Sequence, residues 1–144
     1  MLLKTSNNEN KIDARESEYL YTNHSQIPDA GIGLFTAIDI YKDEIIAIFK
    51  GKILTDAEAR RRAKDGNDRY FINLLNGSIM DSMNAKCFAK YANDANGLSK
   101  SNFKNNAVIT LDDNDKVCIV AIKNIKAGEE LFCSYGKKYW KRHS

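Results

Sequence analysis

The apolar residues of this chain come in short runs, and residues that favour turns separate one run from the next. The longest run, Ile45–Phe49, has the length of a β-strand and is much shorter than the roughly 18 apolar residues of a membrane-spanning helix. Short runs bounded by turns are typical of domains built from small β-sheets. The sequence therefore predicts a mainly β fold that does not cross a membrane.

Several segments have the composition and length of strands. Asn76-Gly77 stands between two of them and is a strong signal for a tight hairpin. Asp112-Asp113-Asn114 marks a second hairpin in the same way. The predicted strands are Glu18–Thr22, Gly33–Thr36, Glu44–Phe49, Arg69–Leu75, Ser78–Asp81, Ala107–Leu111, Lys116–Ile122 and Glu130–Ser134.

Helix signals are clear in one segment, Thr55–Lys64. Thr55 is a good N-cap, and Glu58 three residues later completes a capping box. Gly66 stands just past the expected end, where glycine often terminates a helix. The sequence also predicts a short helix over Ala85–Ala92 and a last helical turn over Lys137–Lys141.

A length of 144 residues fits one domain with a sizeable core. Hydrophobic residues make up 43% of the chain and charged residues 28%, which is typical of a globular protein. Residues 1–16 are polar and are expected to form a lead-in to the domain. No secretion signal is visible, so we expect an intracellular protein that is not secreted, with the nucleus open to it in a eukaryote.

Charge, cysteine spacing and the context of the histidines give little support to several function classes. The net charge of +3 is too small to indicate direct nucleic-acid binding. Cys87, Cys118 and Cys133 have no metal-ligand spacing, so the sequence predicts no metal site. His24 and His143 lack the Ser or Cys neighbours of a hydrolase, which leaves little support for a nucleophilic triad.

Three short motifs carry most of the functional information. Ala30–Phe35 holds two glycines, which let a backbone approach a ligand closely or simply form a tight turn. Phe88–Asp94, followed by Asn105-Asn106, places asparagines at loop ends, where they commonly form turns. Lys126–Gly136 combines a glycine turn, an acidic pair and a strand that ends at Tyr135. Each motif taken alone has an ordinary structural explanation.

Taken together and in this order, the three motifs resemble the SET domain of protein-lysine methyltransferases. The most specific stretches are Pro-Asp-Ala-Gly-Ile-Gly-Leu-Phe at 28–35 and Ile-Lys-Ala-Gly-Glu-Glu-Leu at 125–131. The resemblance implies a mainly β SET-domain fold with small β-sheets, a short helical insert and a C-terminal pseudoknot. It places the SET domain at 17–141, with an inserted segment at about 52–80 and a tail at 142–144.

The resemblance also implies a reaction and the residues that perform it. The chain would transfer a methyl group from S-adenosylmethionine to a lysine side chain of a protein or peptide, with a histone tail as one candidate. Tyr135 would be the catalytic residue, and the substrate channel would be lined by Tyr70, Ile109 and Cys133. The cofactor-binding residues would be Gly31, Ile32, Gly33, Asn93, Asp94, Tyr135 and Trp140.

The chain departs from the family pattern in the central loop. The family has Asn-His-Ser there, whereas this chain has Asn93-Asp94-Ala95, and a longer polar insertion, Asn96–Lys104, precedes Asn106. The zinc-binding cysteines that flank many histone-directed members are absent from this sequence. These departures leave one alternative open, a SET-like module that binds peptides without catalysis.

Two residues of the expected channel bear on how many methyl groups are added. In the family, a tyrosine two residues before the catalytic Tyr tends to stop the reaction at one methyl. This chain has Cys133 there and Ile109 at a second channel position, and neither carries a hydroxyl. We therefore hypothesise di- or trimethylation, with Tyr70 or Tyr91 as alternative sources of the missing hydroxyl.

Overall fold

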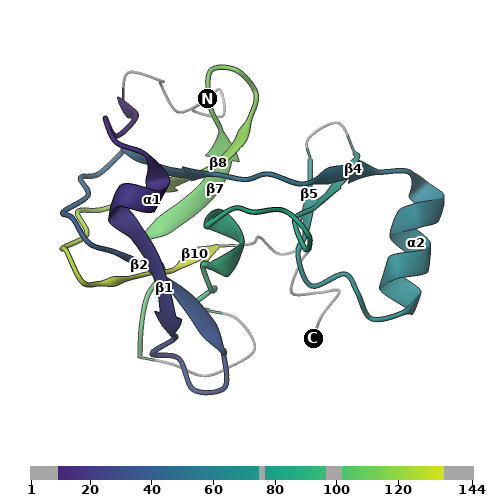
Figure 1. The fold of residues 1–144 in the computed structure, drawn as a ribbon, viewed down its shortest axis with the longest axis horizontal. Helices are drawn as coiled ribbons and strands as arrows, with labels where there is room; N and C mark the ends of the chain where they lie inside the picture. Colours follow the sequence, from purple (N-terminus) through teal and green to yellow (C-terminus); the bar gives the residue numbers. More distant parts are fainter. Residues whose placement is uncertain (1–9, 75–76, 97–101, 135–144) are drawn as a thin grey trace.

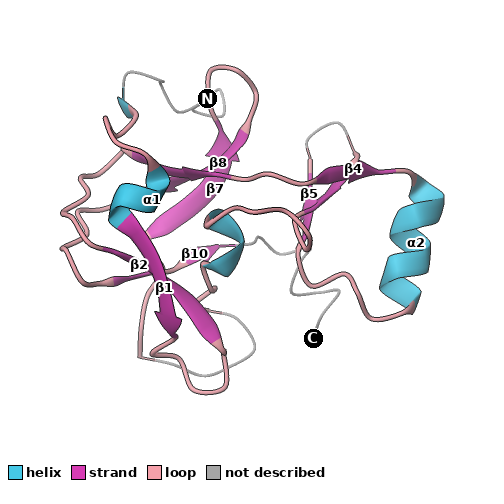
Figure 2. Cartoon of the chain, in the orientation of Figure 1, coloured by secondary structure: helices cyan, strands magenta, loops and turns pink. Residues whose placement is uncertain are grey.

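A computed structural model describes residues 10–74, 77–96 and 102–134. The described chain forms small sheets and short helices (Figure 1 and Figure 2). Two of the sheets lie together, and a third sheet with helix α2 projects to one side (Figure 1). This architecture confirms the predicted mainly β fold.

The first sheet joins strands that lie far apart in the sequence. The helical turn α1 (Glu16–Tyr19) leads into β1 (Leu20–His24), which pairs antiparallel with β2 (Ile32–Thr36). β2 also pairs antiparallel with β9 (Glu130–Leu131). Leu34 of β2 is fully buried where these two strands meet. This sheet therefore ties the first part of the domain to the segment near residue 130.

The second sheet supplies much of the core. Its order is β10 (Cys133–Ser134), β7 (Ala107–Leu111), β8 (Val117–Ala121) and β3 (Ile45–Ile48). Every residue of β8 is buried, which fits its run of β-branched and small side chains. The predicted hairpin between β7 and β8 is confirmed, and β10 runs parallel to β7.

The third sheet and its helix form the projecting part of the molecule. β6 (Ile79–Asp81) lies between β4 (Lys52–Leu54) and β5 (Phe71–Asn73), and α2 (Asp56–Lys64) follows β4. Ala59 of α2 packs in a small apolar cluster with side chains from all three strands. This part therefore has an apolar cluster of its own, while Ile72 of β5 and Met80 of β6 pack with the main core.

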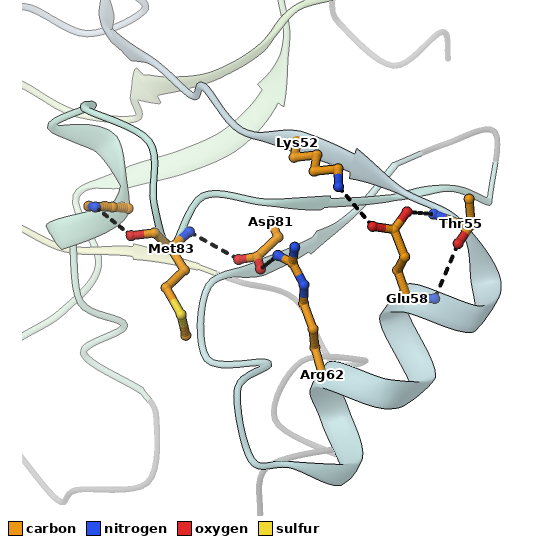
Figure 3. A network of polar contacts seen from close by, with 7 residues as sticks. Lys52, Thr55, Glu58, Arg62, Asp81 and Met83 are labelled. Atoms are coloured by element: carbon orange, nitrogen blue, oxygen red, sulfur yellow. Dashed lines mark hydrogen bonds and ion pairs between the residues drawn. The ribbon is translucent and has the colours of Figure 1, made fainter.

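The start of α2 has the capping box that the sequence predicts (Figure 3). The Glu58 backbone N–H donates to the Thr55 hydroxyl oxygen at 3.1 Å, and the Thr55 N–H donates to the Glu58 carboxylate at 3.2 Å. Lys52 also donates to this carboxylate at 2.8 Å, and that hydrogen bond lowers the pKa of Glu58 to about 2. The capping box fixes where the helix begins.

Residues 130–134 connect the first two sheets. β9 pairs with β2 and β10 pairs with β7, while Phe132 between them forms a parallel bridge with Asn93. The predicted strand Glu130–Ser134 is therefore divided, because Phe132 has a different partner from its neighbours. The part of the expected pseudoknot from residue 135 onward lies outside the described residues.

Two predicted elements differ from the structure in their type of secondary structure over part of their length. The predicted strand Glu18–Thr22 begins within α1, because the Leu20 backbone N–H donates to the Glu16 carbonyl and closes a helical turn before the strand starts. The predicted helix Ala85–Ala92 is reduced to the 3₁₀ turn η2 (Ala89–Tyr91). In an α-helix the Ala85 carbonyl would accept from residue 89, but here it accepts from the Lys90 ammonium and the Cys87 N–H.

One strand, β4, was absent from the sequence-based prediction. It spans only Lys52–Leu54, directly before the Thr55 cap, so it is too short for an alternating pattern to be seen. Within the described ranges, no helix is long and apolar enough to cross a membrane. The predicted helical turn Lys137–Lys141 lies outside those ranges.

Candidate cofactor and substrate site

Glycine is favoured at the two glycine positions of the Ala30–Phe35 motif for different physical reasons. Gly31 adopts φ 73°, in the left-handed region that favours glycine, and beyond its chain neighbours nothing lies within 4 Å of the Cβ position. At Gly33 a Cβ would lie 2.9 Å from Glu130 Cδ and would collide with the Glu130 Oε2 atom. Gly31 therefore shapes an open turn, whereas Gly33 allows β2 to pack closely on Glu130.

Glu130 is a buried acid that fixes the turn before β2. Its carboxylate accepts hydrogen bonds from the Ser25 hydroxyl at 2.6 Å and from the Gln26 backbone N–H at 2.7 Å. The Ser25 backbone N–H donates in turn to the Gly31 carbonyl at 2.8 Å. Sequence reasoning assigned Glu130 no role, since its partners lie about a hundred residues earlier in the chain.

Asn93 joins the glycine turn to the C-terminal segment. Its side-chain amide donates to the Ile32 carbonyl at 3.1 Å, and its backbone carbonyl accepts from the Cys133 N–H at 2.9 Å. Ile32 itself is 44% exposed between the two glycines. The structure thus brings together three of the predicted site residues, Ile32, Asn93 and Cys133.

Asp94 and Ala95 stand where the family has His-Ser. Asp94 is buried, and its carboxylate connects the two ends of the loop that follows. Its Oδ1 atom accepts from the Asn96 N–H and from the Asn105 side-chain amide, each at 2.9 Å. The Asn105 side-chain oxygen accepts from the Ala95 N–H at 2.8 Å. These contacts tie together the two ends of the insertion at 96–104. Asn105 was missed as a site residue, although its place at the end of the insertion is a usable signal.

Asn106 holds the C-terminal segment in place through both its side chain and its backbone. The side-chain amide donates to the Glu130 carbonyl at 3.0 Å, and the side-chain oxygen accepts from the Phe132 N–H at 2.9 Å. The backbone N–H of Asn106 donates to the Phe132 carbonyl at 3.0 Å. Because Asn106 is buried, these bonds fix the segment that leads to Tyr135.

Apolar contacts support this polar arrangement. Phe132 is buried in a cluster with Ile27 and Ala95, so the turn before β2 and the Asp94 loop share one contact. Phe103, from the far end of the insertion, places its ring 5.2 Å from the Phe132 ring. Phe103 remains 37% exposed. The described end of the insertion, at Phe103, therefore packs on Phe132 of the C-terminal segment.

The channel residues predicted from the sequence lie in different surroundings. Cys133 is fully buried in the main core, and Ile109 of β7 is partly buried against the same core. Burial, with a further contribution from the Asp94 charge, raises the pKa of Cys133 well above its usual range. Its thiol is therefore neutral, and we exclude a nucleophilic role for it.

Tyr70 lies beside a lysine that sequence reasoning missed. The Lys90 ammonium lies 5.7 Å from the centre of the Tyr70 ring and 5.2 Å from that of Tyr91. The same ammonium donates to the carbonyl oxygens of Met83 at 3.1 Å and Ala85 at 2.9 Å. A hollow of about 400 Å³ is lined by residues between Met83 and Tyr91, including Lys90, and its lining does not include Tyr70.

Two predicted site residues, Tyr135 and Trp140, lie outside the described residues. Among the residues that the structure describes, no group of three His, Cys, Asp or Glu side chains is placed to hold a metal ion. A second hollow, of about 760 Å³, is lined by residues 48–51 together with Leu74 and residues of β4, β6 and the β7–β8 hairpin. It does not include Gly31, Asn93 or Tyr70.

Comparison with known proteins places this geometry in a family. The chain matches the SET domain family over residues 31–136. It is 30% identical over 128 residues to histone-lysine N-methyltransferase EZH2 of Chaetomium thermophilum, covering 80% of this chain and 8% of that protein. It is 32% identical over 112 residues to histone-lysine N-methyltransferase EZ1 of Zea mays, covering 74% of this chain and 11% of that protein.

Solved structures agree with the sequence comparison. The fold is similar to ctPRC2 in an autoinhibited conformation bound to S-adenosylmethionine, with a TM-score of 0.65 and 30% sequence identity. The similar region covers 82% of this chain and 15% of that one. This chain therefore spans only about a tenth of the length of the curated relatives that it matches. Sequence and fold together confirm the resemblance, and the chain belongs to the SET domain family.

Proposed function

We propose that this chain is a protein-lysine N-methyltransferase that uses S-adenosylmethionine. The observation that carries the proposal is Asn93, which bonds to the Ile32 carbonyl in the glycine turn and to Cys133 in the segment that leads to Tyr135. The three motifs that suggested the family are thus in direct contact. The relatives named above are histone-lysine methyltransferases, and one similar structure holds S-adenosylmethionine.

The residues around the glycine turn fit a bound cofactor. The open space at Gly31 leaves room for a ligand to approach the backbone, and Ile32 is exposed beside it. Gly31, Ile32 and Gly33 would hold the methionine part, and Asn93 its amino group. The Asp94 carboxylate is engaged by Asn96 and Asn105, so the Asp94 position would contact the adenine through its backbone.

Trp140 and Tyr135 complete the proposed site from the sequence. Trp140 would stack on the adenine, and Tyr135 would place its hydroxyl beside the reacting methyl. When bound, S-adenosylmethionine supplies a methyl group on a positively charged sulfur. Tyr70, Ile109 and Cys133 would line the channel through which the substrate lysine reaches it.

The chain's own residues must solve two problems for this reaction. A free lysine has a pKa near 10.4, so its amine is mostly protonated at neutral pH and cannot attack a methyl group. Burial of the amine in a channel with apolar walls favours the neutral form. The channel must also hold the nitrogen in line with the methyl, which lowers the barrier by several kcal/mol.

A transfer assay with labelled S-adenosylmethionine tests this proposal directly. Histones and whole-cell lysate serve as acceptors for the wild type, Tyr135→Phe and the control Tyr41→Phe, whose side chain is on the surface. We expect labelled lysine with the wild type and the control, and roughly a hundredfold less with Tyr135→Phe at an unchanged melting temperature. Cofactor binding without transfer to any acceptor would instead support the peptide-binding module.

We propose a histone lysine as the substrate, because the matched relatives are named for that activity. In a eukaryote this would place the chain in the nucleus. The same assay tests the substrate, since histones and lysate proteins are separated by size before the label is counted. Label confined to proteins other than histones would contradict the histone assignment and keep the methyltransferase.

A further inference from the structure

We infer that Lys90 is a positioning residue of the substrate channel, which holds the Tyr70 wall at a fixed place relative to Asn93. The inference rests on the proposed methyltransferase function. Lys90 would contact neither cofactor nor substrate. Its ammonium instead links the projecting part of the molecule to the segment that carries Asn93.

The surroundings of Lys90 are those of an anchored cation. Its side chain is half-buried, and its ammonium donates two hydrogen bonds to backbone carbonyls, those of Met83 and Ala85. The rings of Tyr70 and Tyr91 lie within cation–π distance of the same nitrogen. Four groups from three places in the sequence therefore converge on one ammonium.

The backbone of Lys90 is fixed to the main core. Lys90 is the middle residue of η2, and the residues on this turn's inner side, Ala89 and Ala92, are fully buried. Asn93 follows directly and bonds to Ile32 and Cys133. Removal of the Lys90 ammonium should therefore leave Asn93 in place, and with it the cofactor-binding residues.

Toward the projecting part, the Lys90 ammonium contacts groups that lie next to its strands, the Met83 carbonyl after β6 and the Tyr70 ring before β5. Asp81 at the end of β6 is buried, and its carboxylate accepts from the Arg62 guanidinium of α2 and from the Met83 N–H (Figure 3). The Met83 carbonyl then accepts from Lys90. Tyr70 connects to the same segment through its own carbonyl, which accepts from the Ser82 N–H at 3.2 Å. Lys90 therefore closes a polar path from α2 to η2.

This path matters for the reaction because methyl transfer depends on alignment. The Tyr70 wall comes from the projecting part, whereas Asn93 and its partners come from the main sheets. A displacement of about 1 Å between these two parts can cost roughly a hundredfold in rate. A residue that joins the parts can thus control turnover without touching the reacting atoms.

The first test compares Lys90→Met with Lys90→Arg and with the control Lys86→Met, an exposed lysine four residues earlier. Methyl transfer to a histone peptide, cofactor affinity by titration calorimetry, and melting temperature are measured for each protein. We expect Lys90→Met to lower kcat at least tenfold while the Kd for S-adenosylmethionine changes less than threefold. Lys90→Arg should recover most of the rate, and the control should match the wild type.

A double-mutant cycle with Tyr70→Leu separates positioning from a general loss of stability. If Lys90 acts through Tyr70, Lys90→Met in the Tyr70→Leu background should lower kcat by less than threefold. Equal tenfold losses in both backgrounds would overturn the inference, as would a Lys90→Met protein with wild-type kcat. If Lys90→Met does not fold, Lys90→Gln takes its place in the cycle and the same criteria apply.

The outcomes also distinguish this inference from the proposed function. A wild-type chain that binds cofactor but transfers no methyl would overturn the methyltransferase proposal and the Lys90 role with it. A wild type with normal transfer and a Lys90→Met variant with equal activity would overturn only the Lys90 role.

Discussion

The sheet β10-β7-β8-β3 and the sheet β4-β6-β5 are held in place by different forces. The first is part of the main core, and every residue of its strand β8 is buried. The second contributes Ile72 and Met80 to that core and has a small apolar cluster of its own. It depends also on directed polar contacts, such as those of Asp81 with Arg62 and Met83 (Figure 3). Apolar burial has little direction, whereas hydrogen bonds and ion pairs fix angles and distances. The main sheets therefore provide stability, and the projecting part provides a precise position.

The largest effect on stability should come from the main sheets. Ile119 of β8 is fully buried, so Ile119→Ala would leave a cavity and lower the free energy of unfolding by about 4 kcal/mol. Urea denaturation followed by circular dichroism measures this loss. A change below about 1 kcal/mol would show that the core can collapse around the smaller side chain, and the contrast between the two sheets would fail.

Asp81→Ala should have a smaller and more local effect. The variant removes the partner of Arg62 and of the Met83 N–H, and we expect a loss of about 2–3 kcal/mol. This is less than for a fully buried pair, because the Arg62 side chain is 30% exposed and can be hydrated. Hydrogen exchange should increase in β4, β5 and β6 and stay unchanged in β8. Equal increases in both sheets would break the comparison.

Thr55→Ala tests the capping box of α2. The hydroxyl that accepts from the Glu58 N–H is lost, and N-caps of this kind contribute about 1 kcal/mol. Thermal denaturation should show this decrease, and Thr55→Ser, which keeps the hydroxyl, should restore most of it. A full loss in the serine variant as well would assign the effect to the methyl group instead of the cap.

Ser82→Ala should raise stability slightly. Within the described residues, the Ser82 hydroxyl is buried and has no hydrogen-bond partner. Removal of an unpaired buried hydroxyl eliminates its desolvation cost, so we expect a gain of up to about 1 kcal/mol. Chemical denaturation of the two proteins side by side measures the gain. A loss above about 1 kcal/mol would mean that the hydroxyl has a partner in solution.

The smallest expected effect concerns the number of methyl groups that the proposed reaction adds. Ile109 and Cys133, both from the main sheets, carry no hydroxyl that could hold a monomethylated amine in place. With excess cofactor and long reaction times, mass spectrometry of a histone peptide should therefore show two or three added methyl groups. A product that stalls at one methyl would contradict this prediction, and Tyr70→Phe would then test whether the Tyr70 hydroxyl imposes the limit.

Local features of the fold were predictable because they depend on neighbouring residues. The capping box of Thr55 and Glu58 and the β7–β8 hairpin follow from spacing within a few positions. The glycine turn was predictable too, since the left-handed conformation that residue 31 adopts favours glycine. Each of these signals lies in a window of fewer than about ten residues.

The polar partners within the site could not be predicted in this way. Ser25 and Glu130 are 105 positions apart, and no period or motif links them. Lys90 looks like an ordinary charged residue until the fold brings two tyrosine rings and two carbonyls to its ammonium. Such contacts depend on the packing of whole sheets, which the sequence pattern describes only as a fold class.

Residues 130–134 pair with strands that lie much earlier in the sequence, and this pairing has a consequence for folding. The Ser25–Glu130 bond closes a loop of 105 residues, and contacts of such long range form slowly and late. The same segment completes the surroundings of Asn93. Affinity for the proposed cofactor should therefore appear only when the native state is complete, so that ligand binding reports on completion of refolding. A ligand that binds only this state would also shift the folding equilibrium towards it.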